Sequence, residues 1–507
     1  MIDHPHHNGR PIRRRHDRGR ILESTDIFDT LLVGGWIIDG TGAARRRGDV
    51  GIQGDRIAAV GDLQARGATA RRVIDAAGKV VAPGFIDTHG HDDLMFMERP
   101  GLEWKTSQGV TSVVVGNCGV SAAPRPLPGN TSASFSLLGQ TELFESHQAY
   151  FQRLESLDPM VNVAALVGHA NLRLAAMKDP LARPTAAEQA RMQQLLEEAL
   201  EAGVVGMSTG LAYEPGCRAE RDELLGLASV AARHGALHTS HIRNEGDDVI
   251  ASVDEVLELG AGSGCATIIS HHKCLLPRNW GSSATTLGSI DRARASGLDV
   301  AMDVYPYTAS STILIADRAE SIDDIKITWS TPHPECGGRY LADIAEEWGC
   351  GRKEAAERLA PAGAIYFAMD EADVQRVLAH PCCMVGSDGL PNDANPHPRL
   401  WGSFTRVLGN YVRRCKLLSL EAAIAKMTAL PATVFGLRDR GTIRPGAYAD
   451  VVVFDPDVVE DRADWDHPTL PSVGIEHVLV NGTAVFPEPP QRRPGRVLKR
   501  NPERCAA

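Results

Sequence analysis

The sequence predicts a (β/α)8 barrel, a TIM-like α/β fold, together with a small β-sandwich domain that both chain termini build. Three observations lead to this fold class. The chain has 507 residues, which is long for one ordinary domain but normal for such a barrel with a small companion. Eight short apolar segments each end in polar or small residues, with helical patterns between several of them. Short strands broken by Gly and Asp turns gather near both ends of the chain.

The eight apolar segments are the expected barrel strands, because near-continuous apolar runs suit strands buried on both faces of a parallel sheet. They are Val80–His91, Val110–Cys118, Val161–Asn171, Val204–Thr209, Leu237–His241, Thr267–Lys273, Leu298–Tyr305 and Cys383–Asp388. The clearest helix between them runs from Thr185 to Ala202, with Thr185 and Glu188 as a capping box and Gly203 as its end. Catalytic groups of this fold lie at the C-terminal ends of the strands.

The remaining segments set the expected domain bounds. Residues 1–25 are rich in His, Arg and Gly without an apolar segment behind them, which predicts a flexible extension rather than a secretory signal. Residues 26–81 and 441–507 supply the two parts of the β-sandwich, and residues 82–440 form the barrel. The connection at about 308–381 is far longer than a usual barrel loop, and we expect it to form a lid at the catalytic face.

Composition narrows the classes of partner. Hydrophobic residues make up 43% of the chain, so a large core can be buried. The net charge of −11 argues against a nucleic-acid partner, since phosphate binding needs clustered Lys and Arg. No apolar run is long enough to cross a bilayer, so no membrane association is expected. Ten cysteines without an export signal predict reduced thiols and a cytoplasmic location. The oligomeric state stays open.

Metal-binding residue types recur at the expected strand ends. His89 and His91 stand two positions apart, and on a strand both side chains face the same side. A single histidine at a strand end is more often a cap for a carbonyl group, so only the whole set together indicates a metal site. The other members, at the ends of strands two, five and six, are Cys118, His241 and His271. Imidazole and thiolate ligands with one water make a catalytic zinc site. Because His272 follows His271 and faces the opposite side, sequence alone leaves open which of the two faces the barrel mouth.

Longer motifs surround these residues. They are 82–93 (APGFIDTHGHDD), 116–119 (GNCG), 208–211 (STGL), 213–216 (YEPG), 241–243 (HIR), 270–274 (SHHKC), 303–307 (DVYPY), 386–391 (GSDGLP) and 397–402 (HPRLWG). In these motifs the chain resembles the D-aminoacylases, or N-acyl-D-amino-acid deacylases, of the amidohydrolase superfamily. The resemblance runs from about Leu31 to Arg500. The Gly-Asn-Cys-Gly and Ser-His-His-Lys motifs are specific to this branch, whereas His-x-His indicates only the superfamily.

The resemblance implies a zinc site and a reaction. Cys118, His241 and His271 resemble the tight zinc ligands of the family, which favours His271 over His272. His89, His91 and Asp388 look like the remaining metal-site residues, which with Cys118 could hold a second, weaker ion. The implied reaction is hydrolysis of the amide bond of a small-molecule N-acyl-D-amino acid to a D-amino acid and a carboxylate.

The parts of this site suggest roles for individual residues. Asp388 would take a proton from water as general base and pass it to the leaving amine. Tyr213 could donate a hydrogen bond to the oxyanion. Groups that the family places near the substrate α-carboxylate, with Ser311 assisting, are Lys273, Tyr305 and Arg399.

Two other functions share parts of the pattern. A cyclic-amide hydrolase, of the hydantoinase or dihydropyrimidinase kind, has the same barrel and His-x-His motif. Cys118, where related barrels use a carboxylated lysine to bridge two metals, favours the deacylase. A non-catalytic barrel scaffold would be expected to lack the metal ligands that this chain has. The preferred side chain, whether neutral, D-aspartyl or D-glutamyl, stays open, as does the choice between one and two metals during turnover.

Overall fold

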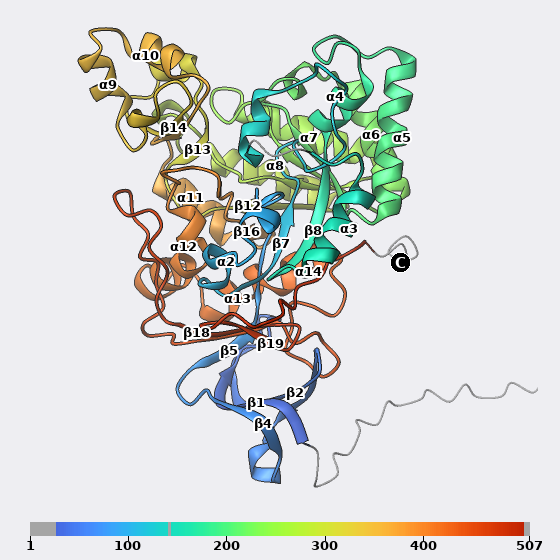
Figure 1. The fold of residues 1–507 in the computed structure, drawn as a ribbon, viewed down its shortest axis with the longest axis vertical. Coiled ribbons are helices and arrows are strands. Elements are labelled where there is room, and N and C mark those ends of the chain that lie inside the picture. The colour runs from blue at the N-terminus through green and yellow to red at the C-terminus, as the bar shows by residue number, and fades with distance from the viewer. Residues whose placement is uncertain (1–26, 140–142, 501–507) are drawn as a thin grey trace, which may run out of the picture.

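The computed structural model describes residues 27–139 and 143–500, and its centre is a barrel of eight parallel strands (Figure 1). These are β6 (Phe85–Asp87), β7 (Val110–Val115), β8 (Asn162–Gly168), β9 (Gly206–Gly210), β10 (Leu237–His241), β11 (Ala266–Ile269), β12 (Val300–Val304) and β16 (Cys383–Val385). They are hydrogen-bonded in chain order, and a parallel bridge between Gly90 and Gly389 joins the last strand to the first. The predicted barrel is confirmed.

Several predicted strands have the wrong extent. The strands predicted to end at Cys118, Lys273 and Asp388 end three or four residues earlier, and two others differ more in kind. Val80–His91 is two strands, because β5 (Val80–Pro83) pairs with β17 (Val451–Phe454) outside the barrel and only β6 belongs to it. Gly84 separates them, and a Cβ atom at this position would lie 2.2 Å from the Thr111 side chain. The predicted strand Val161–Asn171 ends at Gly168, where helix α4 (His169–Ala176) begins. A continuous apolar run does not by itself distinguish a strand from a buried helix.

Helices cover the outside of the barrel (Figure 1). They are α1 (Met95–Glu98), α2 (Glu103–Thr106), α3 (His147–Leu157), α4, α5 (Ala186–Ala202), α6 (Arg221–Arg233), α7 (Val249–Ser263), α8 (Ser283–Ala295), α11 (Glu371–Ala379), α12 (Arg399–Arg406), α13 (Leu420–Met427) and α14 (Ala429–Val434). Helix α5 confirms its sequence signals. Thr185 and Glu188 form the capping box, and Gly203 ends the helix with a φ of 112°.

Both ends of the described chain build one separate β domain, as predicted. Its eight strands are β1 (Ile27–Ile37), β2 (Arg46–Gln53), β3 (Arg56–Gly61), β4 (Thr69–Asp75), β5, β17, β18 (Ile475–Val480) and β19 (Thr483–Phe486). The two groups join where β5 pairs with both β1 and β17. Side chains from both groups, including Val50 and Val451, share one buried cluster. The predicted extension, residues 1–25, lies outside the described residues.

A small subdomain rises between β12 and α11, at the end of the barrel opposite the β domain (Figure 1). Its sheet has the order β13 (Ser310–Ile313), β15 (Ala362–Tyr366), β14 (Ile325–Ser330), and all pairs are antiparallel. Helices α9 (Leu341–Glu347) and α10 (Arg352–Leu359) complete it. We call residues 308–367 the insertion. Because β12 and α11 both belong to the barrel, the insertion stands at the C-terminal ends of the strands.

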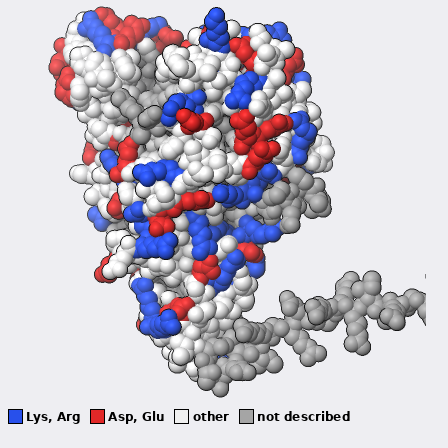
Figure 2. Space-filling view, turned by 45° about the vertical axis from the view of Figure 1, so that its right-hand side comes forward, with Lys and Arg blue, Asp and Glu red and all other residues white. Residues whose placement is uncertain are grey.

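Neither the surface charges nor one large hollow marks the C-terminal end of the barrel strands. Acidic and basic side chains are interspersed on the face that Figure 2 shows. Among the described residues, no helix combines the length and apolar character needed to cross a membrane.

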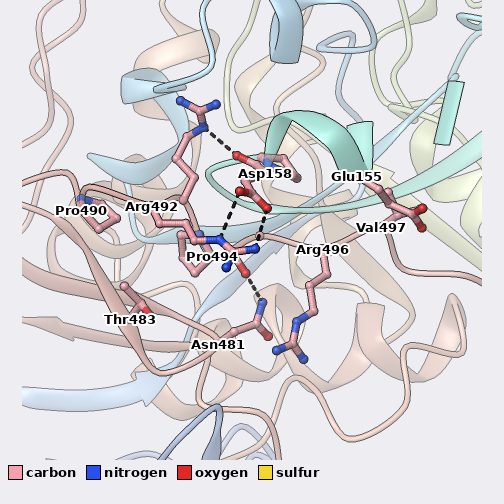
Figure 3. A pocket seen from close by; sticks show the side chains of 12 residues that line it. Glu155, Asp158, Asn481, Thr483, Pro490, Arg492, Pro494, Arg496 and Val497 are labelled. Atoms are coloured by element: carbon pink, nitrogen blue, oxygen red, sulfur yellow. Dashed lines mark hydrogen bonds and ion pairs between the residues drawn. The ribbon is translucent and has the colours of Figure 1, made fainter. Parts of the chain in front are cut away.

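A hollow of about 790 Å³ lies where the segment 490–497 passes the end of α3 (Figure 3). Its charged side chains already have partners, as Arg492 has Asp158 at 3.2 Å and Arg496 has Asp55 at 2.7 Å. Asp158 precedes β8, so this hollow lies at the N-terminal side of the barrel.

Candidate metal centre and active site

The six predicted metal-site residues converge at the C-terminal ends of the barrel strands, and all are buried. They fall into two groups that share Cys118, and within each group the ligand atoms lie within 4.8 Å of one another. The first group is Cys118, His241 and His271, and the second is His89, His91, Cys118 and Asp388. The structure thus brings together the residues of both suggested groups, and their role as metal ligands stays a prediction.

The donor atoms of this centre point at one another rather than at ordinary hydrogen-bond partners. The Cys118 Sγ atom lies 3.3 Å from Nε2 of His89 and 3.3 Å from Nε2 of His271. Asp388 Oδ1 lies 3.2 Å from Nε2 of His91. Neither ring nitrogen of His241 has a hydrogen-bond partner among the described residues, although both are buried. Buried polar atoms are normally paired, so this donor set of sulfur, nitrogen and oxygen fits a zinc ion.

His272 takes a different direction from His271. Its Nε2 atom lies 2.7 Å from the hydroxyl of Thr286 on α8, between the barrel and its outer helices. His271 instead lines the cavity at the barrel mouth. The structure therefore places His271, and not His272, among the clustered side chains that could hold a metal ion.

Three of these residues have left-handed backbone conformations, which are uncommon for residues other than glycine. The φ angles are 54° for Cys118, 36° for His271 and 47° for Asp388. Specific hydrogen bonds hold them, because Asp388 N donates to His89 O at 2.7 Å and His271 N donates to Asp303 Oδ1 at 2.8 Å. Such strain costs of order 1–3 kcal/mol per residue and concentrates at functional sites.

Local charges set the ionisation of two central groups. Burial alone would raise the pKa of the Cys118 thiol, but the neighbouring His89 and His271 imidazoles hold it well below its usual range. Burial would likewise raise the pKa of Asp388, but the Arg399 guanidinium and nearby imidazoles hold it well below its usual range. Asp388 is therefore anionic near neutral pH, as a general base must be, and the surroundings of Cys118 favour the thiolate form that binds a metal.

Tyr213 and Ser311 line the cavity above the metal centre. The Tyr213 ring lies 4.7 Å from the His241 ring, and its hydroxyl is 2.8 Å from that of Thr312. Burial raises the pKa of Tyr213 well above its usual range, so the phenol keeps its proton and can donate a hydrogen bond. The buried hydroxyl of Ser311 has no hydrogen-bond partner among the described residues.

Lys273 also lines this cavity, but acceptors already surround its ammonium group. It pairs with the carboxylate of Glu245, donates to the carbonyl oxygen of His271 at 3.0 Å and lies 2.8 Å from Nδ1 of His271. A lysine has three N–H donors. The substrate contact predicted for Lys273 therefore requires it to exchange one of these partners.

Arg399 and Tyr305 lie behind Asp388 and are not among the cavity-lining residues. Arg399 Nη1 lies 2.8 Å from Asp388 Oδ2, and Nη2 donates to the carbonyl oxygen of Ser311 at 2.9 Å. The guanidinium carbon lies 4.4 Å from the centre of the Tyr305 ring. In this arrangement Arg399 orients Asp388, and its contact with a substrate carboxylate stays a prediction.

Three residues of the site were missed at the sequence level. Arg318, in a short 3-10 helix of the insertion (Ala316–Glu320), lines the cavity opposite the metal centre. Glu245 lies 3.2 Å from Nδ1 of His271, and Asp303 lies 3.3 Å from Nδ1 of His89. Asp303 does lie near the end of the predicted strand Leu298–Tyr305 and opens the 303–307 motif, which is a usable signal. Arg318 stands in a segment without periodicity or a recognisable motif.

A closed barrel with a buried Cys-His-Asp centre at its C-terminal face defines a metal-dependent barrel hydrolase. The model of the amidohydrolase family matches residues 72–331 and 352–486. The N-acyl-D-glutamate deacylase of Alcaligenes xylosoxydans xylosoxydans is 70% identical over 94% of this chain and 97% of its own length. The D-aminoacylase of the same organism is 46% identical over 93% of this chain and 98% of its own length. The chain belongs to the amidohydrolase family, in its D-aminoacylase branch.

Solved structures agree with this placement. The N-acyl-D-glutamate deacylase of Bordetella bronchiseptica, solved with zinc and a phosphonate inhibitor that mimics the tetrahedral intermediate, is 68% identical. Its TM-score is 0.92 over 94% of this chain and 100% of that chain. A D-aminoacylase with a binuclear metal centre is 46% identical, with a TM-score of 0.90 over 93% of this chain and 100% of that chain. The L-hydantoinase of Arthrobacter aurescens is only 18% identical, with a TM-score of 0.60 over 93% of this chain and 100% of that chain, and shares the fold alone.

Proposed function

We propose that this protein is a zinc-dependent hydrolase that cleaves N-acyl-D-glutamate to D-glutamate and a carboxylate. The broader reaction, hydrolysis of a linear amide of a D-amino acid, is supported by relatives that cover nearly the whole chain. The narrower substrate is supported by the higher identity to N-acyl-D-glutamate deacylases, 70% against 46% for the D-aminoacylase. The observation in the structure that carries it is the cationic side chain of Arg318 at the cavity.

The metal centre gives this proposal its cofactor. Cys118, His241 and His271 would hold the tightly bound zinc ion, and a second, weaker ion would use Cys118 with the residues of the second group. Bound zinc lowers the pKa of a water molecule and polarises the amide carbonyl.

The chain's own groups would then move the protons. Asp388 is anionic and fixed by Arg399, so it can take a proton at Oδ1 and later deliver it to the leaving amine nitrogen. Tyr213 keeps its proton and can donate a hydrogen bond to the oxygen that becomes negative. An amine leaves poorly unless it is protonated, so the second transfer by Asp388 is essential.

Arg318 supplies the recognition of the substrate side chain. Its side chain lines the same cavity as Tyr213 and Lys273, and it forms no ion pair with an acidic side chain of the described residues. Its guanidinium carbon instead lies 5.2 Å from the centre of the Tyr366 ring. D-Glutamate carries a second carboxylate, which a guanidinium binds with two parallel hydrogen bonds. A neutral side chain would leave this cation without an anionic partner.

Entry of the substrate requires movement of the insertion. The cavity at the metal centre measures about 10 Å³, which is roughly the space of one water molecule. Ser310, Ser311, Thr312 and Arg318 from the insertion close it on one side. This supports the predicted lid. A cytoplasmic location and the absence of nucleic-acid or membrane partners stay predictions from the sequence.

The variant Arg318→Met tests the substrate assignment. We expect kcat/KM for N-acetyl-D-glutamate to fall roughly 10- to 100-fold, the value of a hydrogen bond to a charged group, mainly through KM. Activity on N-acetyl-D-methionine should stay level or rise. Arg358→Met is the matched control, because Arg358 stands on α10 of the same insertion and pairs with Glu354 away from the cavity. Equal activity of Arg318→Met and wild type on the glutamate substrate would refute the role of Arg318.

A further inference from the structure

Asp303 lies at the end of β12, beneath the metal centre, and its side chain is 2% exposed. It forms no ion pair with Lys or Arg among the described residues, which is unusual for a buried carboxylate. Its Oδ1 atom instead faces two histidines from different strand ends. It accepts a hydrogen bond from the backbone N–H of His271 at 2.8 Å and lies 3.3 Å from Nδ1 of His89.

The contact between Asp303 and His89 bears on the orientation of the His89 imidazole. Nε2 of His89 faces Cys118 Sγ at 3.3 Å and Asp388 Oδ1 at 3.5 Å, so this nitrogen is the one available to a metal. The ring hydrogen must then be on Nδ1. Nδ1 is buried and has no hydrogen-bond partner with good geometry among the described residues, and the carboxylate that approaches it is that of Asp303. An acceptor at Nδ1 fixes the tautomer of a metal-binding histidine.

The contact between Asp303 and His271 bears on a strained backbone. His271 has a φ of 36°, a left-handed conformation that a β-carbon disfavours. The hydrogen bond from its N–H to Asp303 holds this conformation, which directs the imidazole toward Cys118. One carboxylate oxygen thus supports a residue of each ligand group, His271 of the first and His89 of the second.

We infer that Asp303 is a positioning residue that couples the two metal positions by holding His89 and His271 through the same carboxylate oxygen. It touches neither ion nor substrate and acts through the two histidines. The inference rests on the proposed metal centre. It implies that loss of the Asp303 charge weakens the second position more than the first. An amide oxygen in place of Oδ1 can still accept the 2.8 Å hydrogen bond from His271 N–H, whereas the longer 3.3 Å contact with Nδ1 of His89 depends on the charge of the carboxylate.

The test is metal binding by the full-length variant Asp303→Asn, measured as zinc retained per chain in a graded chelator competition. We expect the weaker zinc equivalent to lose affinity by roughly 10- to 100-fold, the usual effect of removing such a partner, with the tighter equivalent less affected. Asp303→Ala removes both contacts and should weaken both equivalents. The matched control is Asp373→Asn, a buried carboxylate on α11 that pairs with Arg376 and contacts no ligand of the centre.

A second background makes the result specific. In His89→Ala, the further change Asp303→Asn should have little added effect on the weaker zinc equivalent, because the imidazole through which Asp303 acts on that position is already absent. Wild-type affinities in Asp303→Asn, or an equal further loss in the His89→Ala background, would overturn the inference. If Asp303→Ala fails to fold, Asp303→Glu, which keeps the charge, takes its place and should retain more of the weaker zinc equivalent than Asp303→Asn. Equal zinc affinities of these two variants would overturn the inference. Wild-type protein that binds no zinc would instead refute the proposed function.

Discussion

Replacing Asp388 by Asn removes the proposed general base while preserving the size of the side chain. Asp388 Oδ1 lies 3.2 Å from His91 Nε2, and Oδ2 lies 2.8 Å from Arg399 Nη1. Asn can offer an oxygen to only one of these two groups and cannot accept a proton at neutral pH. A positioned general base contributes about 10²- to 10⁴-fold, so the barrier should rise by roughly 2.7–5.4 kcal/mol.

The assay is kcat for N-acetyl-D-glutamate at saturating substrate, with zinc content measured on the same sample. Asp388 does not belong to the first ligand group, which is Cys118, His241 and His271. At least one zinc per chain should therefore remain while kcat falls by two to four orders of magnitude. The control Asp373→Asn should keep normal turnover. A value of kcat within about threefold of wild type at equal zinc content would refute the role of Asp388, since even the weak end of the range predicts a 100-fold loss.

Two further predictions concern the metal and the scaffold. Cys118→Ala should lower zinc content below that of wild type after dialysis against a chelator, because Cys118 belongs to both ligand groups; unchanged zinc would contradict its role. Glu223→Gln should lower the melting temperature at pH 7, because Glu223 pairs with Arg173 and His169 in a buried network whose disruption costs about 3–5 kcal/mol. Burial raises the pKa of Glu223, but its two partners hold it below its usual range, so its stabilising effect exists above the unfolded pKa and is lost as pH falls through the folded one. The difference in melting temperature between wild type and variant should therefore shrink toward acid pH, and an equal difference at pH 7 and pH 4 would be inconsistent with this explanation.

The fold could be predicted because its sequence signals are local. Buried parallel strands leave apolar runs, and the capping box at Thr185 with Gly203 marks both ends of α5. The division of Val80–His91 into β5 and β6 could not be predicted, since it depends on pairing with β17, which is hundreds of residues away. Local patterns carry no information about such long-range partners.

The clustering of the six candidate ligands could be predicted for a related reason, because they stand at strand ends that a closed barrel must bring together. The residues that surround these ligands could not be predicted from the sequence. The position of Arg318 depends on how the insertion folds over the barrel mouth, and the pairing of Lys273 with Glu245 depends on side-chain geometry. The choice of His271 over His272 came from family resemblance, whereas the structure gives its physical reason in the contact between His272 and Thr286.

The most direct test of the central claim is the release of amino acid from N-acetyl-D-glutamate and N-acetyl-L-glutamate by the zinc-loaded protein, with N-acetyl-D-aspartate and N-acetyl-D-methionine in parallel. We predict turnover of the D-glutamate substrate well above the other three, loss of activity on zinc removal and its return on zinc addition. Preference for N-acetyl-D-methionine would contradict the assignment of Arg318. No turnover of any of the four by zinc-loaded protein would contradict the deacylase function itself.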